Sequence, residues 1–115
     1  YNDQPPETIF FQGLALRKLG ETEAARAAFQ KLIDYGTVHL DDHLRIDYFA
    51  VSLPAFVASD EDLDRLNRVH CHYLIALGAL GLGDMARARQ HFDAVLALDC
   101  YHFGATVWSA SLPMG

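Results

Sequence analysis

The sequence has no cluster of basic residues. Its 115 residues include 9 Lys and Arg against 15 Asp and Glu, which gives a net charge of −6 at pH 7. A nucleic-acid interface needs a basic surface that meets the phosphate backbone. We therefore expect no nucleic-acid partner.

Long apolar runs are also missing. A membrane-spanning helix needs about 18 or more consecutive apolar residues, and the longest candidate, at residues 73–82, is shorter and contains Gly78 and Gly81. No basic segment followed by an apolar one opens the chain, as it would in a signal peptide. We expect no membrane contact. Because the chain does not begin with Met, we expect it to be part of a longer polypeptide.

Cysteine is scarce. The two cysteines, Cys71 and Cys100, are too few for a disulfide framework. We expect both to be small buried side chains in the core. Two unpaired thiols fit a reducing compartment, so the expected location is cytoplasmic.

Motifs of catalytic sites are absent as well. A phosphate-binding loop would place Lys and Ser or Thr after its glycines, and none follows Gly81 and Gly83. The acidic residues of 41–42 and 60–64 stand where the start of a helix favours negative charge. We therefore expect no catalytic residues in this chain and no cofactor.

Six histidines raise the question of a metal site. His70 and His72 are close in sequence, but neighbouring residues on a helix point in directions about 100° apart. A helical ligand pair needs a spacing of three or four residues. His39 and His43 have that spacing, yet no second ligand pair accompanies them. We therefore expect no metal site.

The stretch from Tyr73 to Leu98 is typical of two helices folded back on each other at a tight turn. Gly83-Asp84 marks the turn. The first of these helices has a strong start signal at Ser59-Asp60, where a capping residue precedes several acids. This pattern predicts helices over about 60–82 and 85–98.

A second helical hairpin is predicted at the N-terminus. Pro5-Pro6 suits the first turn of a helix, and Gly20 and Gly36 each follow an apolar stripe at helical spacing, as residues that end a helix do. Small residues at Gly13 and Ala25 would let the two helices approach closely.

Residues 38–58 lack a clear periodic pattern. Asp41-Asp42 suits a helix start, so we expect a helix over 42–51 and a short apolar segment at 55–57.

The C-terminal segment predicts one more helix. Its apolar residues, spaced to share one helical face, are Phe103, Val107, Trp108 and Leu112. Such a helix would cover the end of a stack of hairpins. We expect a single domain over residues 1–115, with hairpins at 6–36 and 60–99, a connector or degenerate repeat at 38–58 and a cap at 102–112.

The two hairpins align at an offset of 63 residues, which places Gly20 on Gly83. The paired positions are Ala25 with Ala88, Phe29 with Phe92, and Leu32 with Val95. Small residues at the helix crossing and an aromatic residue within the second helix resemble the tetratricopeptide repeat. Where that family often has Pro, this chain has Thr37 and Cys100. The resemblance implies an all-α fold of antiparallel hairpins in a short right-handed solenoid with a C-terminal capping helix.

In tetratricopeptide proteins the first helices of the hairpins line a concave groove. The groove residues that the resemblance implies here are Phe10, Leu14, Arg17, His70, Tyr73 and Leu77. The family's carboxylate clamp uses Lys and Asn at such positions, so the apolar residues of this chain disfavour it. They suit an amphipathic helix or a hydrophobic segment of a partner. The alternative is that residues 38–58 or the helix with Trp108 fill the groove.

The segments IDYFAVSLP and NRVHCHYLIALGALGLGD resemble the C-terminal repeat region of some large bacterial proteins. The N-terminal region of those proteins has carbohydrate-enzyme character. We therefore expect a non-catalytic protein-interaction or scaffolding module of a larger protein, which binds a protein or peptide with an apolar segment. The alternative is a structural appendage that packs on a carbohydrate-active catalytic domain of its parent chain or forms a homodimer.

Overall fold

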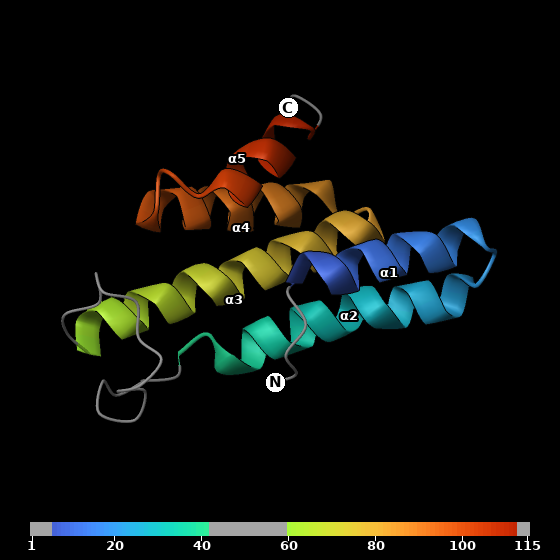
Figure 1. Cartoon of the computed structure of the whole chain (residues 1–115), viewed down its shortest axis with the longest axis horizontal. Helices are drawn as coiled ribbons and strands as arrows, with labels where there is room; N and C mark the ends of the chain where they lie inside the picture. The colour runs from blue at the N-terminus through green and yellow to red at the C-terminus, as the bar shows by residue number, and fades with distance from the viewer. Residues whose placement is uncertain (1–5, 42–59, 113–115) are drawn as a thin grey trace.

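The computed structural model describes residues 6–41 and 60–112, and these residues form five helices and no strand (Figure 1). The helices are α1 Pro6–Lys18, α2 Thr22–His39, α3 Asp60–Leu82, α4 Met85–Leu98 and α5 Phe103–Ala110. The all-α prediction is confirmed. The predicted helix over 42–51 and the apolar segment at 55–57 lie outside the described residues.

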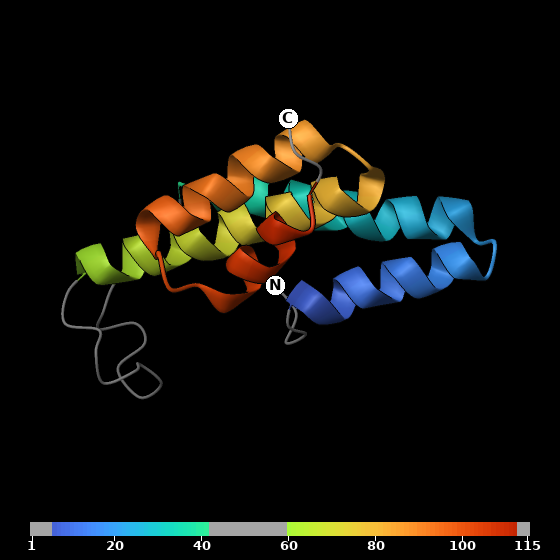
Figure 2. The ribbon, with the colours of Figure 1, turned by 90° about the horizontal axis from the view of Figure 1, so that it is seen from above.

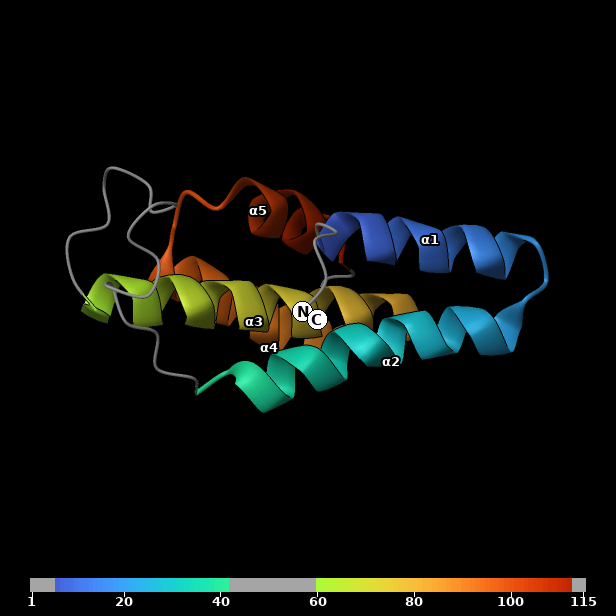
Figure 3. The same ribbon diagram turned by 60° about the horizontal axis from the view of Figure 1, so that its bottom comes forward.

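The helices form two hairpins and a short terminal helix. Helices α1 and α2 run antiparallel, α3 and α4 do the same, and α2 packs along α3 (Figure 1). Helix α5 returns to the side of α3 on which α1 lies, as two further views show (Figures 2 and 3). This return brings the C-terminal helix beside the first helix of the chain. None of the helices in the described ranges has both the length and the apolar character needed to cross a membrane.

The turns of the two hairpins repeat each other. Gly20 and Gly83 adopt positive φ angles of 83° and 84°, which glycine reaches without steric cost. At each turn two backbone N–H groups donate back to the end of the preceding helix. These bonds run from Gly20 to Arg17, from Glu21 to Leu16, from Gly83 to Leu80 and from Asp84 to Ala79. The predicted offset of 63 residues therefore relates the turns bond by bond.

The core follows the same offset. Six residues that pair at this offset are exposed by 2% or less: Ala25 and Ala88, Phe29 and Phe92, and Leu32 and Val95. Burial of such apolar side chains is the main favourable contribution to folding. The two hairpins thus contribute equivalent residues to one continuous core.

Close contact between α2 and α3 depends on small residues. A Cβ atom on Gly78 would lie 2.5 Å from the carbonyl oxygen of Phe29 and 2.6 Å from Cγ1 of Ile33. A Cβ atom on Gly81 would collide with the ring of Phe29. On the α1 side, a Cβ atom on Gly13 would lie 2.6 Å from Cε1 of the same ring. The Phe29 ring therefore fills the space that Gly13 and Gly81 leave open, and Gly78 admits the Phe29 backbone and the Ile33 side chain.

The prediction that Gly36 ends the second helix is wrong. Helix α2 continues to His39, and Gly36 is a buried residue inside it. A Cβ atom at this position would lie 2.6 Å from the carbonyl oxygen of Cys71 in α3. The glycine therefore permits a close helix contact and does not end the helix.

The two cysteines also differ from each other. Cys71 is fully buried, as predicted, but Cys100 is exposed. Cys100 follows α4 at the turn that leads to α5, so it faces solvent instead of the core.

Replacing Gly78 with Ala tests the α2–α3 contact. Helix propensity alone would stabilise this variant by about 1 kcal/mol. Overpacking against a backbone carbonyl group costs about 1–3 kcal/mol, so we expect Gly78→Ala to lower the free energy of unfolding measured in urea. The control is Ala86→Gly on the exposed face of α4. Its free energy of unfolding should fall by about 1 kcal/mol, because glycine has a lower helix propensity than alanine. A stabilised Gly78→Ala variant would contradict the packing argument.

Candidate functional site

The structure divides the predicted groove residues into buried and accessible ones. Phe10, Tyr73 and Leu77 are exposed by only 2%, 3% and 0%, so they do not line an open groove in this arrangement. The other three differ: Leu14 and His70 are half-buried and Arg17 is exposed. Contact of these six residues with a partner remains a prediction.

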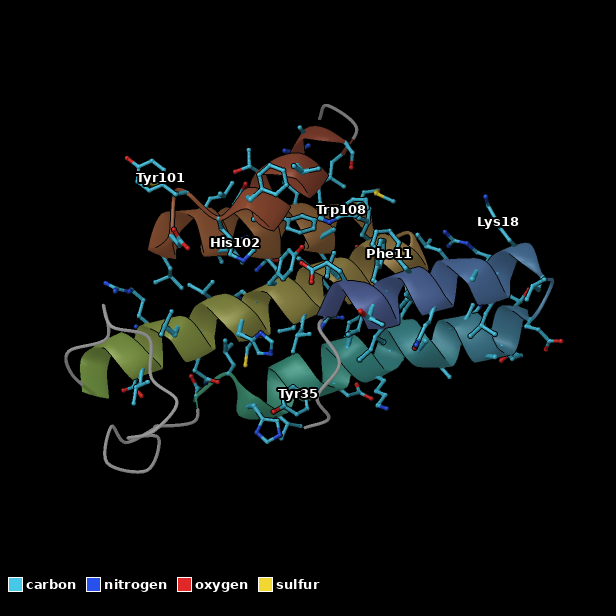
Figure 4. The ribbon with its side chains drawn as sticks, in the orientation of Figure 1. Phe11, Lys18, Tyr35, Tyr101, His102 and Trp108 are labelled. Carbon is cyan, nitrogen blue, oxygen red and sulfur yellow. The ribbon has the colours of Figure 1, made fainter. Side chains whose placement is uncertain are left out.

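Helix α5 lies over part of this surface. The ring of Trp108 packs edge-on against Phe10, with centroids 5.2 Å apart and an interplanar angle of 73°. It also lies 6.0 Å from the ring of Phe11, and the Phe11 and Trp108 side chains are close together in Figure 4. On α3, the ring of Tyr73 lies 4.6 Å from that of His102. At Phe10 and Tyr73 the predicted groove surface is therefore covered by the C-terminal segment that contains Trp108 and His102.

Local interactions hold the start of α5. His102 caps the helix, since its Nδ1 accepts a hydrogen bond of 3.0 Å from the backbone N–H of Ala105. Gly104 touches the Tyr73 hydroxyl group so closely that a Cβ atom would collide with it. The first turn of α5 is thus fixed directly over α3.

The residues of α5 do not form the single apolar face that the sequence predicted. Ala105 and Leu112 are buried, and Trp108 packs on α1. Phe103 and Val107 instead point away from the core, with 80% and 45% of their surface exposed. These two residues, together with exposed Phe11 and Tyr101, are called the outer face below. Figure 4 shows Tyr101 projecting from the molecule.

The hydroxyl group of Tyr73 is buried beneath α5. It has no hydrogen-bond partner among the described residues. Burial, followed by the influence of the Glu7 carboxylate, raises the pKa of this phenol above its ordinary value. The Tyr73 phenol therefore stays neutral at neutral pH.

Two histidines meet between α3 and α4. The Nδ1 atoms of His72 and His91 lie 2.9 Å apart, so one neutral ring donates to the other. Burial is the largest cause that lowers the pKa of both rings. Arg68 lowers the pKa of His72 further, and the proximity of the His72 ring and of Arg87 does the same for His91. Asp41 opposes the shift at His72. Over the described ranges, no three His, Cys, Asp or Glu side chains are grouped so that they could hold a metal ion.

The histidine pair escaped sequence reasoning because its members are 19 residues apart on different helices. In the sequence, His70 and His72 are the closest histidines, but the ring contact of His72 is with His91. His70 is a separate half-buried residue whose pKa is lowered by burial and raised in part by Glu7. The pair could have been found by placing the two predicted helices of the second hairpin antiparallel to each other. In that arrangement Ala76 and Ala88 share one core, and His72 and His91 lie about one turn further from the hairpin turn.

The pair predicts a pH dependence of stability. Both histidines have folded-state pKa values below the ordinary value of 6.5, so the unfolded chain binds more protons below that pH. Stability is therefore complete above about pH 6.5 and falls as the pH is lowered toward the folded-state pKa values. We expect the free energy of unfolding to decrease between pH 7 and 5, and to decrease less steeply in His91→Gln. The free energies of unfolding are measured by urea titration at each pH. The prediction is contradicted if they change equally with pH in the unaltered chain and in His91→Gln.

Arg17, the last residue of the predicted set, lies away from α5. Its Nη1 donates a hydrogen bond of 2.7 Å to the carbonyl oxygen of Gly81 near the end of α3. The guanidinium carbon lies 5.6 Å from the centre of the Phe29 ring, within the range of a cation–π interaction. Arg17 therefore ties the first hairpin to the second.

Comparison with known families gives one match. Residues 10–35 match the family model of the tetratricopeptide repeat, and the match covers most of α1 and of α2. No solved structure matches the chain significantly.

Proposed function

We propose that the chain is a non-catalytic protein-interaction or scaffolding module of a larger protein, because residues 10–35 match the family model of the tetratricopeptide repeat. Tetratricopeptide repeats generally mediate protein–protein interaction and are typically non-catalytic. The partner that we propose is a protein or peptide with an apolar segment.

The way in which α5 packs supports this proposal most directly. A short helix already lies on the surface formed by α1 and α3, with its Trp108 ring against Phe10. Aromatic side chains make effective anchors because they bury a large area at low cost in conformational entropy. A helix of similar character from a partner would find the same anchor position when α5 moves aside.

The groove residues then have distinct roles. Phe10 and Tyr73 form the floor on which an aromatic anchor packs, as Trp108 and His102 do in the present arrangement. Leu14 continues the apolar surface along α1, and Leu77 supports the floor from within the core. Half-buried His70 borders the surface on α3.

A peptide that copies α5 tests this surface. We expect a labelled peptide of residues 101–112 to bind Trp108→Ala at least about tenfold more tightly than the unaltered chain, measured by fluorescence anisotropy, because the tethered α5 no longer competes well. The matched control is Phe103→Ala on the outer face, which should bind as weakly as the unaltered chain. Equal binding to all three proteins would contradict the groove.

A second variant tests the same surface in case Trp108→Ala does not fold. Gly104→Ala keeps every aromatic residue but introduces a Cβ atom that collides with the Tyr73 hydroxyl group. It should displace α5 and also raise the affinity for the peptide, and the total helical signal in circular dichroism should fall by no more than the share of the eight-residue α5.

The alternative function is a structural appendage that packs on a domain of the parent chain or on a second copy. The outer face favours it, because Tyr101 and Phe103 are exposed by 90% and 80%. Exposed groups of large apolar residues commonly mark interaction surfaces. Tyr101 and Phe103 are not among the groove residues, so substitutions at these two positions test the alternative separately.

Light scattering tests the alternative. If a second copy covers the outer face, the mass should rise from the 12.8 kDa of one chain toward twice that value as the concentration increases. Phe103→Asp should then keep the chain monomeric, because a buried carboxylate without a partner is strongly unfavourable. A constant monomer mass for the unaltered chain would contradict self-association.

A further inference from the structure

A second candidate site lies away from α5, where the first half of α2 runs beside the end of α3 (Figure 1). A cavity of about 330 Å³ opens there between the two hairpins. Its volume is at the lower end of the range for ligand-binding pockets. Its apolar walls include Phe29 and Leu82, and its polar walls include Thr22, Arg17 and Arg26.

The charge of this pocket is opposite to that of the chain. The chain has a net charge of −6, yet the residues that line the pocket include two arginines and no carboxylate in the described part of the chain. A guanidinium group forms paired, charge-assisted hydrogen bonds with carboxylates and phosphates. The pocket is therefore suited to an anionic group.

Arg17 is held in place before any ligand binds. One of its N–H groups is bonded to the carbonyl oxygen of Gly81, and its plane lies near the ring of Phe29. These contacts engage only part of the donor set of the guanidinium group, which has five N–H donors. Less side-chain entropy is lost on binding when a donor is already positioned.

The start of α2 lies at the same pocket, and the carboxylates of Glu21 at its N-cap and Glu23 in its first turn offset its positive end. Thr22 is the first residue of this 18-residue helix, and the preceding Glu21 makes no side-chain hydrogen bond that caps it. The N-terminal end of a helix carries a partial positive charge. The end of α3 brings an opposing partial negative charge to the same pocket, and the bond from Arg17 to Gly81 offsets it.

From these observations we propose that the pocket binds an acidic peptide segment of a protein partner, with a carboxylate between Arg17 and Arg26 and a neighbouring apolar side chain against the exposed part of Leu82. The combination of two cations and an apolar wall distinguishes this ligand from a purely apolar helix. The site does not depend on the groove under α5, and a partner need not displace α5 to reach it.

Nuclear magnetic resonance titration of the whole chain tests the site. The probe is a hexapeptide of alternating glutamate and leucine with both ends blocked. We expect saturable shifts of the Thr22 and Gly81 amide signals and of the Arg17 side-chain signal, which weaken as salt is added. A peptide with glutamine in place of glutamate, and inorganic phosphate, serve as the comparison ligands.

Two matched variants locate the binding. Arg26→Gln should lower the affinity for the glutamate peptide at least about tenfold, the effect expected for one charge-assisted hydrogen bond. Lys31→Gln removes the same charge from an exposed position of the same helix outside this pocket, and should change the affinity less than about twofold. Both positions are exposed, so the amide spectra should otherwise be unchanged.

Each other outcome overturns the proposal. Absence of saturation at millimolar peptide, or equal binding of the glutamine peptide, would show that the arginines do not select a carboxylate. Equal losses of affinity in Arg26→Gln and Lys31→Gln would mean that the peptide is attracted by the positive charges of α2 in general and not by this pocket. Shifts with phosphate but not with the peptide would assign the pocket to small anions. None of these results bears on the peptide assay at the α5 surface, so the two sites are judged separately.

Discussion

The contact of Phe29 with three glycines, two at its ring and one at its backbone, is the constraint on which the rest of the fold depends. Gly13 of α1 and Gly81 of α3 both leave space for this ring, and Gly78 lies against the Phe29 backbone. The ring is exposed by only 1%, and in a close-packed interior an added Cβ atom at Gly13 or Gly81 would have no free space. The ring thereby sets the spacing of α1, α2 and α3, and it also forms one wall of the arginine pocket.

Local signals in the sequence predicted the hairpins well. Gly20 and Gly83 end helices through their own φ angles, and the repeated core residues follow a fixed offset. The prediction that Gly36 ends a helix was wrong, because a glycine at a helix end and a glycine at a close contact with another helix cannot be told apart in the sequence. Only the position of Cys71, on another helix, separates the two cases.

The candidate sites were harder to predict because they depend on where distant elements meet. Helical spacing identified α5, but the burial of Phe10 depends on the docking of Trp108 from the other end of the chain. The pair of His72 and His91 likewise requires two antiparallel helices in one register. The bond from Arg17 to Gly81 joins residues that are 64 positions apart in the chain, so it too depends on how the two hairpins pack.

The short connection between α4 and α5 affects how tightly any other helix can bind to the surface that α5 covers. A helix tethered by a few residues has an effective concentration of the order of millimolar at its own docking site. Any free helix that replaces α5 must first overcome this internal competitor, so its apparent affinity falls in proportion to the fraction of chains with α5 released. The strength of the contacts at His102, Gly104 and Trp108 would then set a threshold, below which weak ligands are rejected without any change in the groove itself.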